Sequence, residues 1–396
     1  MKHHQIVIAG GGTAGITVAA HLLTKQPGLD IAIVEPSSKH YYQPIWTLVG
    51  GGVFQKEVSE RDQADVIPPG ATWIQDRIAG FDAEHNTVQL EQAGALTYDY
   101  LIVALGIQLD WNKIPGLAES IGKPGTGVCS NYSYQTVGST WATMQAMKKG
   151  TAIFTQPSTP IKCGGAPQKI CYLAEDYFQR QGVRDKVDVV FASAADGIFH
   201  VPHYVPALNA VIARRHISAR YKHDLVEIKP DQKQAVFKRM DTGELVTMGY
   251  EMLHVTPPMS APDVLKTSGL GNEGGWVNVD KGTMQHVAYP NVFSLGDCSS
   301  LPTSKTGAAI RKQAPALADN LLAVMHHRTP SHLYDGYTSC PLVTGYGSLI
   351  LAEFDYDKKP TETFAFDQSK ERYSMYALKA YGLPQIYWHG MLKGRA

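Results

Sequence analysis

The feature that most constrains the fold lies near the start of the chain, where closely spaced glycines separate two apolar runs. In "QIVIAGGGTAGITVAAHLL", Gly10, Gly12 and Gly15 have the spacing G-x-G-x-x-G between a predicted strand and a predicted helix. Glu35 closes the next predicted strand, 20 residues after Gly15. This pattern predicts a dinucleotide site, because the glycines permit a tight turn and close approach of the pyrophosphate, and the acid accepts from a ribose hydroxyl.

Composition excludes several other classes of protein. The 396 residues include 36 basic and 36 acidic side chains, so the balanced charge gives no bulk attraction to nucleic acid. The five cysteines are too few and too irregularly spaced for a disulfide framework or a zinc site, and no metal is expected. No apolar run reaches the length of a spanning helix, and no leader precedes the first predicted strand. Any membrane contact is therefore expected to be peripheral.

Two later segments extend the first motif. The predicted strand in "YDYLIVALGIQLDW" ends at Ala104, Leu105 and Gly106, and "NVFSLGDCSS" contains Gly296 and Asp297. This order of motifs resembles the flavoproteins with two dinucleotide-binding domains, in which the first motif borders FAD and the Gly-Asp pair supplies a carboxylate to the ribityl chain. The resemblance also implies that the helix beginning in "TSKTGAAIRKQAPALADNL" points its N-terminus at the flavin.

The predicted fold is therefore α/β, with two Rossmann-like domains and a C-terminal membrane-binding segment. We expect residues 1–112 and 285–328 to form a discontinuous FAD domain and residues 113–284 to form the second domain. Residues 329–396 are expected to form a separate C-terminal segment.

The second domain lacks the residues of a nicotinamide site. Its first predicted strand, "GTAIFTQ", leads into "PSTPIKCGGAPQ", where Pro157 and Pro160 stiffen the loop and remove hydrogen-bond donors that would face phosphate. Its second predicted strand ends in Ala192-Ser193-Ala194, without an acid or an arginine to bind a ribose. The sequence predicts a domain that kept this fold and lost its nucleotide site.

Long strings of the chain resemble the sulfide:quinone oxidoreductases, in the branch that includes the mitochondrial form. The resemblance runs nearly end to end, through "YYQPIWTLVGGG", "KCGGAPQKICYLAE", "YEMLHVTPPMSAPDVLKTS", "LGDCSSLPTSKT", "YDGYTSCPLVTGYG", "LAEFDYD" and "FDQSKERYSMY". It implies noncovalent FAD, hydrogen sulfide as electron donor, a membrane quinone (ubiquinone or menaquinone) as acceptor, and an acceptor for sulfane sulfur.

The family's two redox cysteines fall on Cys163 and Cys340. By this resemblance hydrosulfide attacks a Cys163–Cys340 disulfide, because thiol–disulfide exchange gives one persulfide and one thiolate. Cys340 is then expected to carry the persulfide, and Cys163 to pass electrons to FAD, which reduces quinone. The sulfane sulfur leaves to an acceptor or as polysulfide.

The same resemblance predicts the residues around the cofactors. The FAD site is expected to contain Gly10, Gly12, Thr13, Ala14, Gly15, Glu35, Gln43, Ile78, Ala104, Leu105, Gly106, Gly296, Asp297, Lys305 and Thr306. The resemblance further implies that the segment 329–396 contains Cys340, a quinone pocket and membrane-anchoring helices. Tyr346 and Phe354 are candidates for the wall of the quinone pocket.

The other thiols and two histidines have weaker predictions. Cys171 and Cys298 are interpreted as small packing residues. Cys129 stays open, because another branch of the family carries a third cysteine near this place, which in some members is linked to FAD. His200 and His203 are either loop residues or part of a sulfide entrance.

The C-terminal stretch predicts two short amphipathic helices split at Gly382-Leu383-Pro384, with Lys379, Lys393 and Arg395 at their edges. Such a pattern suits the lipid headgroup region, and the alternative is that the apolar face packs on protein. Its apolar residues are Tyr373, Met375, Tyr376, Leu378, Tyr381, Ile386, Tyr387, Trp388, Met391 and Leu392. With no leader, the expected location is the cytoplasmic face of a bacterial inner membrane.

Two other functions share parts of this pattern. A type II NADH:quinone dehydrogenase has the same architecture, but it needs the missing second glycine motif and has no use for the two cysteines. A non-catalytic persulfide-binding or sulfide-sensing flavoprotein keeps the cysteines and reduces quinone poorly. The sulfane acceptor, the quinone species and a homo-oligomeric state stay open.

Overall fold

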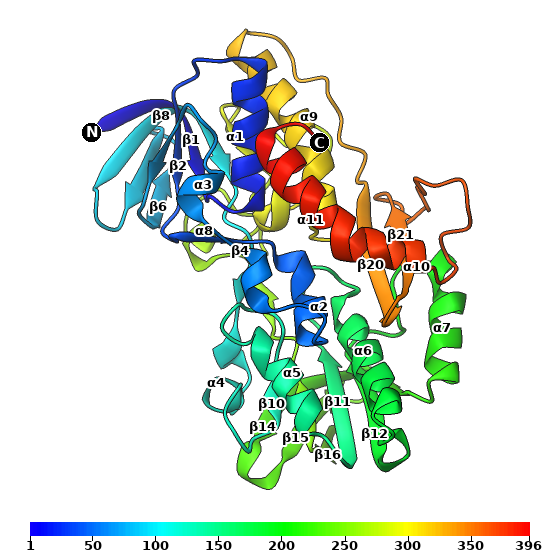
Figure 1. Ribbon diagram of the computed structural model, residues 1–396. Helices are drawn as coiled ribbons and strands as arrows, with labels where there is room; N and C mark the ends of the chain where they lie inside the picture. Colours follow the sequence, from blue (N-terminus) through cyan, green and yellow to red (C-terminus); the bar gives the residue numbers. More distant parts are fainter.

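A seven-stranded sheet forms the centre of the upper unit in the computed structural model, which describes residues 1–396 (Figure 1). Its parallel part is buried on both faces, as the apolar run of β1 requires. The sheet order is β5 (Ala71–Ile74), β2 (Ile31–Val34), β1 (Lys2–Ala9), β8 (Ala95–Val103), β7 (Thr87–Leu90) and β6 (Ile78–Asp82), with β19 (Val292–Ser294) also paired to β8. The pairs β8–β7 and β7–β6 are antiparallel, and the others are parallel.

Two long helices, α1 (Thr13–Lys25) and α9 (Gly307–Met325), pack against each other beside this sheet (Figure 1). Every residue of α1 from Ala14 to Leu22 is buried, so the helix is enclosed on all sides over this length. The short elements of the chain include β3 (Lys39–Tyr41), β4 (Glu60–Asp62), α2 (Trp46–Gly50), α3 (Gln63–Val66), α4 (Leu117–Ser120) and α8 (Asp263–Lys266), of which α2 contacts both α5 and α6 of the lower unit.

A second parallel sheet of five strands forms the lower unit and confirms the predicted second Rossmann-like fold. Its order is β10 (Val128–Cys129), β17 (Met252–His254), β11 (Gly150–Gln156), β12 (Val187–Ser193) and β13 (Ser218–Tyr221). Helices α5 (Val137–Ala146), α6 (Ala166–Arg180) and α7 (Val205–Arg214) belong to this unit. A separate antiparallel sheet consists of β14 (His223–Lys229), β15 (Gln234–Arg239) and β16 (Leu245–Gly249).

The chain crosses between the units on two adjacent segments, β9 (Gln108–Leu109) and β18 (Met259–Ser260), which pair antiparallel. Soon after β18, Leu265, Leu270 and Val277 already lie in the core of the upper unit. The return to that unit therefore begins well before the expected residue 285. The sequence offers no periodic signal here, because isolated bridges such as Val279–His286 replace long strands.

A hairpin of β20 (Thr338–Gly345) and β21 (Ser348–Phe354) joins the two units rather than forming part of a separate segment. Cys340, Leu342 and Ile350 belong to the core of the lower unit. Val343 and Leu349 belong to the core of the upper unit. The hairpin is therefore shared between two hydrophobic cores.

The C-terminal helical run is continuous from Tyr373 to Lys393, which differs from the predicted split at Gly382-Leu383-Pro384. It comprises α10 (Tyr373–Ala377), a π-helical segment (Leu378–Gly382), α11 (Leu383–Gln385), a second π-helical segment (Ile386–Gly390) and a 3₁₀ turn (Met391–Lys393). Pro384 occupies the first turn of α11, where a missing N–H is tolerated and the helix need not break.

Most of the apolar face of this run packs on the protein. Met375, Tyr376, Tyr387, Trp388, Met391 and Leu392 are buried in the core of the upper unit. Lys379, predicted at the edge facing lipid, is buried too, and its Nζ donates to the carbonyl oxygen of Pro44 at 3.1 Å. Only Tyr373, Tyr381 and Ile386 of the predicted apolar residues are exposed. No helix in the structure has the length and apolar character needed to cross a bilayer.

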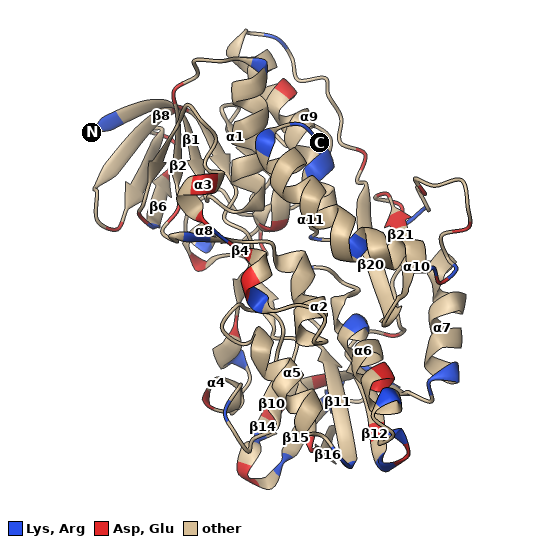
Figure 2. Cartoon of the chain, viewed as in Figure 1, with Lys and Arg blue, Asp and Glu red and all other residues tan.

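Charges of both signs are interspersed over the whole chain (Figure 2), in agreement with the equal numbers of basic and acidic side chains.

Because Leu392 is fully buried near the end of the run, Leu392→Ala is expected to lower the free energy of unfolding by about 2–5 kcal/mol. Chemical denaturation of the purified protein measures this change. Leu245→Ala is the matched control, since Leu245 is 64% exposed and its truncation is expected to stay within about 0.5 kcal/mol. Equal effects of the two substitutions would contradict a core role for the end of the run.

Candidate functional site

The glycine turn between β1 and α1 has the geometry that a pyrophosphate needs. Gly10 has φ +107°, and a Cβ there would lie 2.4 Å from the carbonyl oxygen of Ala104. A Cβ on Gly15 would lie 1.9 Å from the carbonyl oxygen of Gly10, so only glycine lets the helix approach the turn this closely. A Cβ on Gly12 would meet nothing within 4 Å, which leaves the backbone open on that side. These positions fit the first dinucleotide site predicted from the sequence.

Glu35 lies directly after β2 rather than within it, and its carboxylate faces the turn. Its two oxygens accept from the backbone N–H of Gly11 at 2.9 Å and of Ser37 at 2.8 Å. Burial raises the pKa of Glu35, while the two backbone donors act in the opposite direction. Each carboxylate oxygen has two lone pairs and so keeps one for a ribose hydroxyl.

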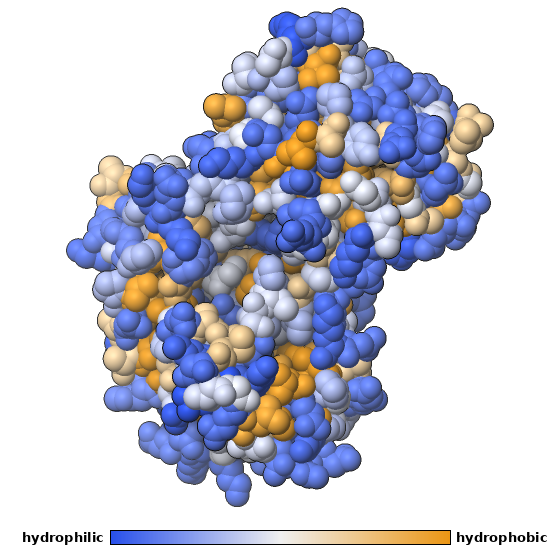
Figure 3. All heavy atoms as spheres, turned by 180° about the vertical axis from the view of Figure 1, so that it is seen from behind, coloured by the Kyte–Doolittle hydropathy of each residue, from blue (hydrophilic) through white to orange (hydrophobic).

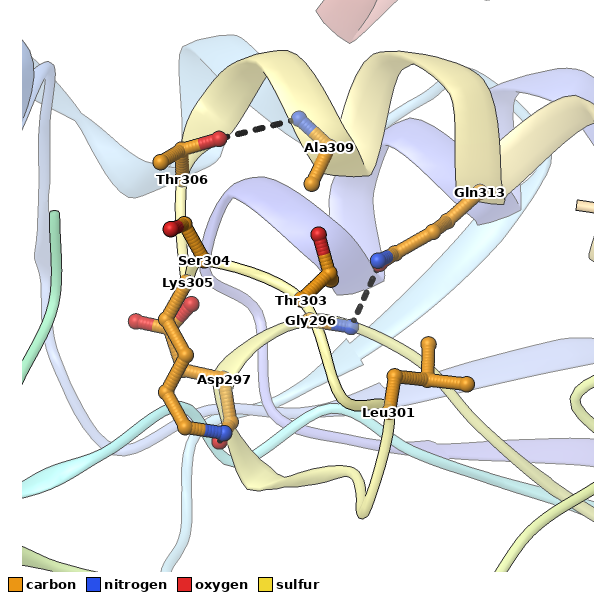
Figure 4. A pocket seen from close by; sticks show the side chains of 9 residues that line it. All are labelled: Gly296, Asp297, Leu301, Thr303, Ser304, Lys305, Thr306, Ala309 and Gln313. Carbon is orange, nitrogen blue, oxygen red and sulfur yellow. Dashed lines mark hydrogen bonds between the residues drawn. The ribbon is translucent and has the colours of Figure 1, made fainter. Parts of the chain in front are cut away.

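A second wall is formed by the loop after β19 and the start of α9 (Figure 4). Gly296 has φ +73°, and its N–H donates to Gln313 at 2.9 Å. Thr306 caps α9 by accepting from the N–H of Ala309 at 3.1 Å. The Nζ of Lys305 donates to the main-chain carbonyl oxygen of Asp297 at 2.5 Å. The start of α9 is thereby tied to the Gly-Asp turn.

The Asp297 carboxylate lies in this wall and accepts no hydrogen bond from the protein. Burial raises its pKa, and the nearby cations of Lys305 and Lys162 lower it. A partly buried carboxylate without protein donors fits a ligand rich in hydroxyl groups, such as a ribityl chain. The open turn at Gly12 and this free carboxylate together fit FAD.

The remaining predicted FAD residues differ in their surroundings. A Cβ on Gly296 would lie 3.1 Å from the Cβ of Ala14, so the two walls meet there. Ala104, Leu105 and Gly106 follow the end of β8, and Ala104 backs the glycine turn. Thr13 is the first residue of α1. Ile78 is buried in the upper core at the start of β6, and Gln43 accepts from the Nζ of Lys162 at 2.8 Å.

Cys163 and Cys340 are 177 positions apart in the chain and lie in contact. Cys163 sits in the loop between β11 and α6 with φ +55°, an uncommon conformation for a residue with a side chain. Its N–H donates to the carbonyl oxygen of Lys305 at 2.8 Å, which attaches the loop to the wall containing Asp297. Cys340 is fully buried in β20, and both thiols are free in this structure.

The two thiols have opposite electrostatic settings. A hydrogen bond from Cys340 and the cation of Lys169, whose Nζ lies 3.1 Å from the Cys163 Sγ, hold the pKa of Cys163 well below its usual value. Two effects mainly raise the pKa of Cys340 well above its usual value. The larger is the hydrogen bond that its thiol donates to Cys163, and the second is burial. The Cys163 thiol therefore loses its proton more readily than the Cys340 thiol.

The other three cysteines differ from this pair in their chemical setting. Cys171 in α6 and Cys298 after β19 are fully buried, and burial raises the pKa of both thiols. Burial also raises the pKa of Cys129 to about 12, so this thiol is protonated at physiological pH.

His200 lies beside the Cys163 loop, and His203 does not. A Cβ on Gly164 would be 3.5 Å from the His200 ring, whose Nε2 is 3.4 Å from the Ser304 hydroxyl. Burial lowers the pKa of His200. His203 is instead 3.4 Å from Glu362 at the surface.

Tyr346 and Phe354 lie at opposite ends of β21. Phe354 is buried and packs its ring 5.3 Å from the ring of His200, on the side of the cysteine pair. Tyr346 lies in the hairpin turn and donates its hydroxyl to the carbonyl oxygen of Gly51 at 2.6 Å. At ~3.3 Å per residue the strand separates the two residues by about 20 Å or more, and their place in a quinone pocket stays a prediction.

Two lysines near the pair were missed by the sequence reasoning. Lys169 lies in the first turns of α6, the helix that follows Cys163. A lysine in the first turns of that helix was the sequence signal that could have identified it. Lys162, next to Cys163, donates to Gln43 and to the carbonyl oxygen of Tyr132 at 3.0 Å. Burial lowers the pKa of Lys162 to about 8, while Asp297 raises it.

Comparisons with known proteins agree with this geometry. Residues 4–149 match the family described as pyridine nucleotide-disulphide oxidoreductase. The chain is 51% identical to the mitochondrial sulfide:quinone oxidoreductase of Mus musculus, over 99% of this chain and 87% of the relative. It is 50% identical to the protein of the same name from Dictyostelium discoideum, over 99% of this chain and 86% of the relative.

A solved structure shows the same fold. The sulfide:quinone oxidoreductase of the hyperthermophilic bacterium Aquifex aeolicus superposes with a TM-score of 0.85 at 19% identity. The superposition covers 100% of this chain and 92% of that chain.

In the reduced protein, Lys169→Met is expected to raise the apparent pKa of Cys163 by roughly 1 to 3, because a cation in contact with the thiolate is removed. The rate of alkylation of Cys163 by iodoacetamide, followed against pH by mass spectrometry, measures it. Alkylation near pH 6 should slow, and higher pH should restore it. Lys149→Met at an exposed lysine is the control, and an unchanged profile for Lys169→Met would contradict the assignment.

Proposed function

Because the chain belongs to the sulfide:quinone oxidoreductase family, we propose that Cys163 and Cys340 are the redox pair attacked by sulfide. The protein is an FAD-dependent oxidoreductase with sulfide as electron donor and quinone as acceptor. The observation that carries the proposed mechanism is the contact between two cysteines whose pKa values are shifted in opposite directions, beside the wall that contains Asp297.

The proposed first step is thiol–disulfide exchange on the oxidised pair. Hydrosulfide forms a bond to the Sγ of Cys340, the bond between Cys340 and Cys163 breaks, and the bonding electron pair leaves with Cys163 as thiolate. Cys163 is the better leaving group, because Lys169 and Cys340 stabilise its anion and a thiol of lower pKa leaves faster. The physical setting therefore supports the persulfide on Cys340.

When bound, FAD supplies a two-electron acceptor for the dithiol and a two-electron donor for quinone. Gly10, Gly12 and Gly15 would hold its pyrophosphate, Glu35 a ribose and Asp297 the ribityl chain. Cys163 is tied to this site by its hydrogen bond to Lys305. The sulfane sulfur then leaves Cys340 with a nucleophilic acceptor or as polysulfide, which frees the Cys340 thiol. Closing the Cys163–Cys340 disulfide again gives up two electrons, which would pass to the bound FAD.

We infer that FAD is held without a covalent bond. Cys129, the thiol left open by the sequence, is fully buried in the lower core, and its pKa of about 12 keeps it protonated. A protonated, enclosed thiol is a poor nucleophile. Hydrogen bonds to the glycine turn and to Asp297 are sufficient for a dissociable cofactor.

The lower unit disfavours the alternative function, a type II NADH:quinone dehydrogenase that takes electrons from NADH. The loop after β11 contains Pro157 and Pro160, and β12 ends at Ser193 without an acid or an arginine. Neither feature supports a bound dinucleotide.

The expected location on a bacterial inner membrane is wrong. The relatives from Mus musculus and Dictyostelium discoideum are both mitochondrial by name and align with 99% of this chain. They point to a mitochondrial rather than a bacterial inner membrane. The expectation depended on how the given sequence begins, which is weaker evidence than similarity along the chain.

The function is tested by anaerobic addition of donors to the purified yellow protein. Sulfide is expected to bleach the flavin absorbance within seconds, and NADH is not. Cys163→Ser and Cys340→Ser are each expected to lower sulfide-dependent quinone reduction by orders of magnitude, because serine oxygen cannot exchange sulfur and the pair acts as a unit.

Cys171→Ser is the matched control, since this buried thiol lies in α6 outside the site, and near-normal turnover is expected. Rapid bleaching by NADH would contradict the choice of donor. Ordinary turnover of Cys163→Ser or of Cys340→Ser would contradict the dithiol mechanism.

We also propose that the exposed side of the C-terminal run rests on the membrane surface. Tyr381 is 59% exposed and Ile386 is 38% exposed, although buried aromatic residues surround them. The ring of Phe54 packs 5.9 Å from that of Tyr381 and extends the apolar area. The run lies across the front of the molecule in Figure 1, whereas the opposite face in Figure 3 is largely hydrophilic with separate apolar patches. Exposed apolar side chains gathered along a helical run suit the headgroup region.

The double substitution Tyr381→Ser and Ile386→Ser is expected to weaken binding to liposomes by at least about tenfold, because each apolar side chain contributes roughly 1.5 kcal/mol or more when buried in lipid. Sedimentation with vesicles of mixed neutral and anionic lipid measures the bound fraction. Leu245→Ser removes an equally exposed apolar residue from β16 and should bind as the wild type does. Equal binding of all three proteins would contradict this surface.

A further inference from the structure

The end of the C-terminal run contacts the glycine turn directly. Tyr387 is 2% exposed, and its hydroxyl lies 2.9 Å from the Oγ1 of Thr13, the first residue of α1. The same hydroxyl lies 2.5 Å from the Nε2 of His40. A residue 374 positions away therefore determines where the Thr13 side chain points.

Further contacts close a network around the turn. The Gln63 side-chain amide donates to the carbonyl oxygen of Gly11 at 2.9 Å, and Gly11 donates to Glu35. His40, on β3, is buried beside Gln63, and burial lowers its pKa to about 4. A neutral imidazole has one donor and one acceptor nitrogen, so it can hold the Tyr387 hydroxyl without placing a cation beside the turn.

The run is attached to α1 at a second place. Gly394 has φ +66°, and a Cβ there would lie 2.8 Å from the carbonyl carbon and oxygen of Ala20. Trp388, next to Tyr387, is covered by the Arg61 guanidinium, whose Cζ is 4.9 Å from the ring centroid. With contacts at its first residue and at its middle, α1 is held along half its length by the end of the chain.

We propose that Tyr387 is a positioning residue for FAD: its hydroxyl, which is held by His40, orients the Thr13 hydroxyl directly and fixes the start of α1 where the pyrophosphate binds. The first N–H groups of a helix that follows a glycine turn face the phosphates, so the position of this first residue bears directly on affinity. Tyr387 itself does not enter the cofactor site. The inference rests on FAD occupying the glycine turn, as the proposed function states.

The test measures the dissociation constant of FAD by titrating apoprotein, prepared by acid release of the cofactor, and following flavin fluorescence. Tyr387→Phe keeps the ring in its core and removes only the hydroxyl. It is expected to weaken FAD binding roughly three- to tenfold, the effect of one buried hydrogen bond. Tyr250→Phe is the matched control with unchanged affinity, because the Tyr250 hydroxyl is buried in the lower unit without a partner.

A double-mutant cycle separates orientation of Thr13 from general stability. In a Thr13→Val background, which lacks the hydroxyl that Tyr387 contacts, Tyr387→Phe is expected to have no further effect on FAD affinity. Full additivity of the two substitutions, or unchanged affinity of Tyr387→Phe alone, would overturn the inference. Wild-type protein that binds no FAD, or does not release it in acid, would instead contradict the proposed cofactor site.

Discussion

The β20–β21 hairpin is buried in two hydrophobic cores at once, and the proposed redox site depends on this constraint. Alternate residues of the hairpin enter the cores of the upper and lower units, so neither strand can shift without exposing apolar surface. This register places Cys340, fully buried, against the loop that carries Cys163. The loop is held in turn by the hydrogen bond from Cys163 to Lys305. One packing arrangement thus joins the thiol pair to the wall that contains Asp297.

The asymmetry between the two thiols follows from this placement. Cys340 lies on a buried strand and donates to Cys163, which raises its own pKa. Cys163 lies at the start of α6, where Lys169 reaches its sulfur. In the mechanism we propose, stabilisation of one anion and burial of the other would give the disulfide a preferred direction of cleavage, because the sulfur that leaves more easily is the one tied to the wall that contains Asp297.

The C-terminal run combines two roles that the sequence pattern does not separate. Its exposed residues, Tyr381 and Ile386, are the ones we propose to meet lipid. The adjacent Tyr387 and Trp388 are buried against the glycine turn and α1. A periodic apolar pattern looks the same whether the apolar face meets lipid or protein, since both environments exclude water.

The sequence by itself determined the fold class and the first dinucleotide site, because these depend on local patterns. The glycine spacing before α1, the acid after β2 and the apolar strands are all readable within a few tens of residues. The missing nicotinamide site of the lower unit was predicted in the same way, from the prolines and the uncharged end of β12.

Only the tertiary structure decided the features that join distant segments. Cys163 meets Cys340 across 177 positions, and Tyr387 meets Thr13 across 374, and neither contact has a local signal. The resemblance to a family predicted the first of these pairs, and nothing in the sequence indicated the second. The burial of Lys379, expected at a membrane edge, likewise depended on which elements surround it. Local pattern determines which faces avoid water, whereas the choice of partner for each face is made by the packing of the whole chain.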